Sequence, residues 1–72
     1  MSVSPYPTRG GVQFDRRDAG RSIRVAAHPD AGLVTISVWR GDQCVATHQM
    51  SADDAATLIA ILADAMAACA ER

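Results

Sequence analysis

Two cysteines and two histidines are the only soft metal ligands in this 72-residue sequence. Cys44 and His48 stand four positions apart within one predicted strand, so we expect their side chains to share a face. Structural zinc sites usually take paired ligands from tight turns with a C-x-x-C spacing, which this sequence lacks. We therefore expect His28, Cys44, His48 and Cys69 to bind no metal, and we expect no cofactor.

Thiol catalysis is the second chemistry to weigh. A nucleophilic cysteine needs a thiolate in electropositive, partly exposed surroundings. Cys69 falls on an apolar helical stripe near acidic residues, whereas Cys44 lies beside a predicted hairpin tip and is the better candidate. No glycine-rich phosphate loop and no pair of carboxylates on a common face accompanies either cysteine. The sequence indicates a protein that is not an enzyme, with a Cys44-based thiol function as a minor hypothesis.

The charge is unevenly distributed, although the net charge is only −1. Residues 1–40 hold six arginines against three aspartates, a balance of +3, and residues 41–72 hold one arginine against five carboxylates, a balance of −4. The basic side chains concentrate around the first predicted hairpin, at Arg16, Arg17, Arg21 and Arg24. These arginines could contact phosphates while Phe14 or Trp39 stacks on bases, so single-stranded nucleic-acid binding is the alternative function.

The small size of the chain favours a homodimer. Seventy-two residues are near the lower limit for one independently stable core. The hydrophobic fraction is 49%, but much of it is alanine, which contributes little buried area, and only three residues are aromatic. We expect a homodimeric protein-interaction or regulatory domain, with a further protein partner as an open possibility.

The location of the protein follows from what the sequence lacks. The start, MSVSPYPTRGG, has no apolar core of a secretory signal, and the apolar stretch 58–63 is too short to cross a bilayer. The two cysteines form no disulfide-scaffold pattern. The abundance of alanine, arginine and aspartate suggests a GC-rich genome such as that of an actinomycete. We expect a cytoplasmic protein without membrane contact.

Regularly spaced turns predict an antiparallel meander. We expect a flexible N-terminal arm over residues 1–11 and a single α+β domain over residues 12–72. Glycine, proline and aspartate mark turns at 18–20, 29–32 and 41–42. The alternating runs between them predict strands at 12–17, 21–28, 33–39 and 43–50, in the spatial order of the sequence.

A C-terminal amphipathic helix completes the predicted ββββα fold and is expected to close the core. Ser51 is a strong N-cap, and Asp54 three residues later resembles a capping box. An apolar stripe follows at helical spacing, formed by Ala55, Leu58, Ile59, Leu62, Met66 and Cys69. Ile61, Ala65 and Ala68 form a shoulder of mostly small residues beside this stripe, which a second helix could approach closely.

The register of the last hairpin leaves two alternatives open. A regular Gly41-Asp42 turn would pair Val38 with Val45 and leave both faces of the sheet partly apolar. Either a β-bulge shifts the register, or a second subunit buries the second face. For a dimer, the candidate interface residues are Trp39, Ile61, Ala65 and Ala68.

The stretch SVWRGDQCVATHQMSADDAATLIAILADAMA, residues 37–67, resembles small uncharacterised actinomycete proteins. In those proteins a strand ending in Trp-Arg and a Cys-Val strand precede a Ser-x-x-Asp-Ala-Ala helix. The resemblance implies no activity, because the role of that family is unassigned. The order of elements also resembles a transcriptional coactivator family that binds single-stranded DNA as dimers. Its lysine-rich strands and helix tryptophan are missing here, so no site residue carries over.

Overall fold

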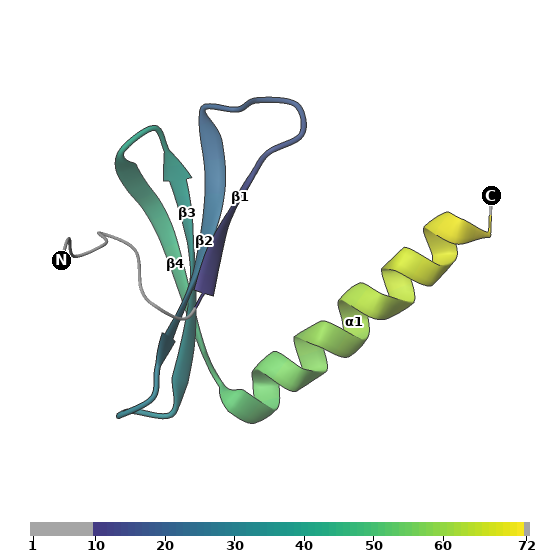
Figure 1. Ribbon diagram of the computed structural model, residues 1–72. Helices are drawn as coiled ribbons and strands as arrows, with labels where there is room; N and C mark the ends of the chain where they lie inside the picture. Colours follow the sequence, from purple (N-terminus) through teal and green to yellow (C-terminus); the bar gives the residue numbers. More distant parts are fainter. Residues whose placement is uncertain (1–9, 72) are drawn as a thin grey trace, which may run out of the picture.

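The computed structural model describes residues 10–71 as one antiparallel sheet followed by one helix. The strands are β1 (Gly10–Phe14), β2 (Arg21–His28), β3 (Leu33–Arg40) and β4 (Gln43–Ser51), and the helix is α1 (Ala52–Ala70). The strands lie in the order β1-β2-β3-β4 (Figure 1). The predicted ββββα fold and the strand order are confirmed.

Aspartate side chains end β1 earlier than predicted. The backbone N–H of Arg17 donates to Oδ1 of Asp15 at 2.8 Å, and that of Gly20 donates to Oδ1 of Asp18 at 2.9 Å. These local bonds compete with the strand ladder, so β1 ends at Phe14 rather than at residue 17. The same backbone N–H of Arg17, aided by its guanidinium, holds the pKa of Asp15 below its usual value.

The first residue of β1 must be glycine. Gly10 has a φ of 141°, and a Cβ there would collide with the carbonyl oxygen of Val25 on the neighbouring strand. Because Gly10 and Gly11 pair with β2, two residues predicted for the arm belong to the sheet. Residues 1–9 of the predicted arm lie outside the described residues.

The β3–β4 hairpin contains a bulge. Gly41 has a φ of 60° at the first central position of the turn, which fits a type II′ turn. Trp39 pairs with Cys44 as predicted, but Val38 pairs with Ala46, which leaves Val45 as the extra residue of a β-bulge. The predicted pairing of Val38 with Val45 is wrong, and the bulge is the alternative that holds.

The bulge separates the two faces of the sheet by polarity. The side chains of directly paired residues lie on the same face of the sheet, so the register assigns every paired residue outside the bulge to one of the two faces. The apolar face carries Ile23, Val25, Ala27, Val34, Ile36, Val38, Ala46 and Met50. The opposite face, called the polar face below, carries the polar residues Ser22, Arg24, Thr35, Ser37, Thr47 and Gln49 together with Val12, Phe14, Ala26, Leu33, Trp39 and Cys44. The sheet therefore has one mainly apolar face and one mixed face, and the bulge moves Ala46 and Met50 off the face that carries Trp39.

The helix begins at the predicted residue. Ser51 is the N-cap, with its hydroxyl accepting a hydrogen bond from the backbone N–H of Asp54 at 3.1 Å. Asp53 and Asp54 lie in the first turn, where the helix dipole favours negative charge. The helix closes at Glu71, whose backbone N–H donates to the carbonyl of Ala68 at 3.3 Å.

Replacing the cap should destabilise the protein measurably. Ser51→Ala leaves the N–H of Asp54 without its acceptor, and we expect a loss of about 1 kcal/mol in the free energy of unfolding. Urea denaturation followed by circular dichroism measures this change. The conservative variant Ser51→Asp retains an acceptor and should keep the wild-type midpoint. A midpoint unchanged in Ser51→Ala would contradict the role of the cap.

The helix does not close the core, contrary to expectation. It follows β4 without an intervening loop residue and diverges from the sheet (Figure 1). It contacts only β4 and β3, and none of its residues is buried; Ala55 and Leu58 are half-buried. No loop residue separates Ser51 from Ala52, so the chain has no connection there that turns α1 back over the sheet. Among the described residues, Met50 is the only buried hydrophobic side chain.

Candidate interaction surfaces

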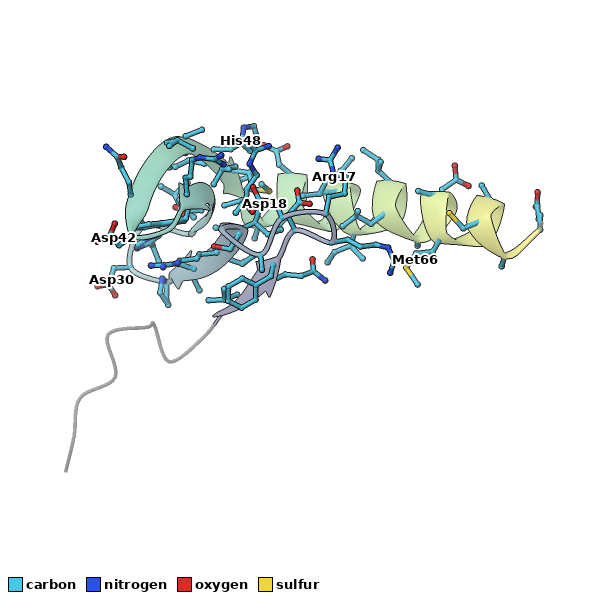
Figure 2. All side chains as sticks on the ribbon, turned by 90° about the horizontal axis from the view of Figure 1, so that it is seen from above. Arg17, Asp18, Asp30, Asp42, His48 and Met66 are labelled. Atoms are coloured by element: carbon cyan, nitrogen blue, oxygen red, sulfur yellow. The ribbon has the colours of Figure 1, made fainter. Side chains whose placement is uncertain are left out.

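The free part of α1 presents a continuous apolar surface to solvent. Ile59, Ile61, Leu62 and Met66 are between 55% and 71% exposed, and we call these four residues the exposed stripe. Figure 2 shows Met66 on the part of the helix that extends beyond the strands. Large apolar side chains in one contiguous patch are unusual on a soluble monomer and commonly mark interaction surfaces.

A groove lies where α1 leaves the sheet. It has a volume of about 360 Å³, and its apolar walls include Met50 of β4 and Leu58 and Ile61 of α1. His48 also lines the groove. Because the register places His48 and Met50 on the apolar face, the helix departs from that side of the sheet. The groove and the apolar face therefore open toward the same side as the helix.

The apolar face is only partly covered within the chain. Its residues on β2 and β3, including Ile23, Val25, Ile36 and Val38, are all half-buried, and Ala46 on β4 is exposed. A sheet in a stable domain normally buries its apolar face against another layer. In the part of the chain that the structure describes, no second layer covers this face, because α1 touches only β3 and β4.

The four predicted interface residues do not form one surface. Ile61, Ala65 and Ala68 are exposed on the helix, as the helical spacing predicts. Trp39 instead lies on the polar face, away from the side from which the helix departs. A single contact could use the helix shoulder or Trp39, but one flat partner surface could not cover both.

Trp39 is held in a polar cluster. The Arg24 guanidinium lies 3.8 Å from the centroid of the Trp39 ring, a cation–π contact. The indole N–H of Trp39 donates to the Ser37 hydroxyl at 2.7 Å, and that hydroxyl donates to the Arg24 carbonyl at 3.5 Å. The indole is therefore fixed in orientation on the polar face.

The register also aligns Phe14 with Trp39. Phe14 pairs with Ser22, which in turn pairs with Trp39, so the two aromatic residues lie in one row across the polar face. Two strand spacings separate them, about 10 Å. Phe14 is 65% exposed. The sequence offered both residues as stacking candidates, but their alignment follows only from the strand pairing.

The predicted arginine cluster is divided. Arg21 and Arg24 are an odd number of residues apart on β2, so their side chains point to opposite faces. Arg17 forms an ion pair with Asp15 at 3.4 Å in the β1–β2 turn. Within residues 10–71, Arg16 and Arg21 have no carboxylate within ion-pairing distance. The concentrated positive charge expected here is thus reduced to two arginines near the hairpin end.

The cysteines and histidines are not brought together. The bulge at Val45 puts Cys44 opposite Trp39 on the polar face and His48 opposite Ile36 on the apolar face, so the predicted shared face is wrong. The Cys44 thiol donates weakly to the carbonyl of Ala46 at 3.5 Å. Over residues 10–71, no three histidine, cysteine or acidic side chains lie close enough to hold a metal ion.

The surfaces available are thus an apolar stripe, a half-covered apolar face and an aromatic row on a polar face. The single described helix is not apolar enough over its length to cross a membrane. Each of these features suits the binding of another molecule. Comparison of the chain with protein families, curated proteins and solved structures found no match.

Proposed function

We propose that this protein is a non-enzymatic, cytoplasmic homodimer that acts as a protein-interaction or regulatory domain. The observation that carries this proposal is α1, a 19-residue helix with no buried residue and an exposed apolar stripe. Most of the stability of a helix in a protein comes from packing of its apolar face, and in the single chain only the first two turns of α1 are packed. A second subunit supplies that packing.

The surface area of the chain supports an obligate partner. The chain exposes 6085 Å², whereas a folded protein of its mass exposes about 4,300 Å². If the ten residues outside 10–71 are allowed the area of an unfolded chain, about 1,700 Å², the described residues still exceed the expected area by about 600 Å². A standard interface buries about 800 Å² per partner. The excess is therefore of the size that one dimer interface removes.

The dependence of stability on concentration tests the proposal. Because folding is linked to association in such a dimer, we expect the thermal midpoint to rise by several degrees for each roughly tenfold increase in protein concentration. Sedimentation equilibrium should give twice the chain mass at micromolar concentration. A monomeric mass together with a midpoint that does not change on dilution would refute the homodimer.

A second function is favoured by the aromatic row on the polar face. Phe14 and Trp39 lie in register on one face, and Arg16, which has no ion pair within residues 10–71, lies in the turn that follows Phe14. Aromatic side chains beside arginines are the usual means of binding single-stranded nucleic acid without sequence preference. We propose this binding as the alternative function, and it is compatible with a dimer because the polar face lies opposite the apolar face.

Oligonucleotide binding at low salt tests the alternative. Phe14→Ala should weaken binding of a single-stranded oligonucleotide by about 1–3 kcal/mol, because one stacking contact is lost. Arg16→Ala should reduce the salt dependence of binding by about one phosphate contact. The matched control is Arg40→Ala, whose guanidinium lies 3.5 Å from Asp18 and should matter less. No binding by the wild type at low salt would eliminate this function.

A further inference from the structure

We infer that the dimer forms by reciprocal helix exchange, with the free part of α1 from each copy packed on the apolar face of the other copy's sheet. This inference rests on the proposed homodimer and specifies the surfaces that meet. It joins the exposed stripe, Ile59, Ile61, Leu62 and Met66, to the half-covered apolar face of β2 and β3. Each surface is apolar and largely uncovered in its own chain, although Ile61 also lines the groove beside Met50.

The direction in which α1 leaves β4 carries the helix away from its own sheet. The helix starts at the residue after β4, and its only half-buried residues, Ala55 and Leu58, lie in the first two turns. From Ile59 onward every described helix residue is exposed. The first two turns therefore pack near Met50, and the remainder of the helix extends away from the sheet (Figure 1).

The two surfaces match in size. Residues 59–70 span about 18 Å as an α-helix, and the eight-residue strands β2 and β3 span about 26 Å. A helix about 10 Å wide covers roughly two strands that lie about 4.8 Å apart. The stripe can therefore cover Ile23 and Val25 on β2 together with Ile36 and Val38 on β3.

Helix exchange covers both open surfaces, which other pairings do not. A dimer made only by the two helices would leave the apolar face open, and a dimer made only by two sheets would leave the helices bare. In a two-fold symmetric dimer the same contact occurs twice, so one kind of contact buries both stripes and both faces. The described residues expose about 600 Å² more than a folded protein of their mass, which approaches the roughly 800 Å² that one partner buries in a standard interface.

Paramagnetic labelling in mixed dimers tests this arrangement. One chain carries Cys44→Ser, Cys69→Ala and Ala67→Cys, and a nitroxide is attached to the new cysteine. Ala67 lies on the side of the helix opposite the exposed stripe, so we expect the label to leave the contact intact. It is mixed with an isotope-labelled chain that carries only Cys44→Ser and Cys69→Ala. We expect loss of the amide signals of β2 and β3, including Val25 and Ile36, in the isotope-labelled chain.

A second label position checks the direction of the helix. Moving the nitroxide to Ala60 by Ala60→Cys should shift the affected amides along β2 and β3, because the two positions are seven residues, about 10 Å, apart on the helix. Loss of signals confined to α1, in mixtures shown by mass to contain dimers, would overturn helix exchange and leave the homodimer intact. A monomeric mass for both variants and for the wild type would refute the homodimer as well.

Discussion

Leu62→Glu is expected to dissociate the proposed dimer and lower its thermal stability. Leu62 is 55% exposed in the single chain and lies in the exposed stripe. Burial of a leucine side chain contributes about 2 kcal/mol to the free energy of association. Because the contact occurs twice in a two-fold symmetric dimer, about 4 kcal/mol is lost, and the dissociation constant should rise about a thousandfold. Burying the new carboxylate without a partner would add to this effect. Sedimentation equilibrium measures the change directly.

Ala67→Glu is the matched control for Leu62→Glu. Ala67 is exposed on the opposite side of the same helix, about 7.5 Å farther along its axis, and this variant adds the same charge away from the stripe. Its dissociation constant should stay within about threefold of the wild-type value, since surface substitutions usually change stability by less than about 0.5 kcal/mol. Equal effects of the two variants would mean that charge, rather than the apolar stripe, governs association.

Met50→Ala is expected to destabilise the fold by about 3 kcal/mol. Met50 is 6% exposed, the only buried hydrophobic residue among residues 10–71, and it lies between the apolar face and the first turns of α1. Truncation of a buried methionine to alanine leaves a cavity and usually costs about 2–5 kcal/mol. Total stabilities of small domains are about 5–15 kcal/mol, so urea denaturation should show a much lower midpoint.

Val45→Ala provides the comparison within the same strand. Val45 is the extra residue of the bulge and is 57% exposed, so the same kind of truncation should change stability by less than about 0.5 kcal/mol. If Val45→Ala were as destabilising as Met50→Ala, the bulge residue would have to be buried in the dimer. If Met50→Ala left the urea midpoint unchanged, packing of Met50 against the first turns of α1 would not contribute to stability.

The local elements could be predicted because short-range chemistry specifies them. Positive φ at Gly32 and Gly41, and the hydrogen bond that the Asp18 side chain accepts from Gly20, are properties of a few neighbouring residues. The start of α1 likewise depends on Ser51 and the amide three residues later. The end of β1 was missed by three residues because Asp15 can serve equally as a strand residue or as the acceptor of a turn, and propensity does not separate the two.

The candidate site was less predictable because it depends on pairing between strands. Cys44 and His48 alternate onto one face in an ideal strand, but the extra residue Val45 moves them to opposite faces. The alignment of Phe14 with Trp39 across β2 also requires the register of three strands. The only sequence signal of the bulge was that regular pairing left both faces partly apolar, which correctly raised the bulge as an alternative.

The order and approximate bounds of four strands and one helix can be predicted from the amino-acid sequence, because alternation, turn residues and the Ser51 cap act over a few residues. Which residues share a face of the sheet, and where the helix points, become known from the folded chain alone. Both depend on interactions that sequence spacing does not encode: the pairing of Val38 with Ala46, and the absence of a connection that could turn α1 back after Ser51. An amphipathic stripe indicates that a helix packs against an apolar partner. Whether that partner lies in the same molecule depends on the direction in which the helix leaves the sheet.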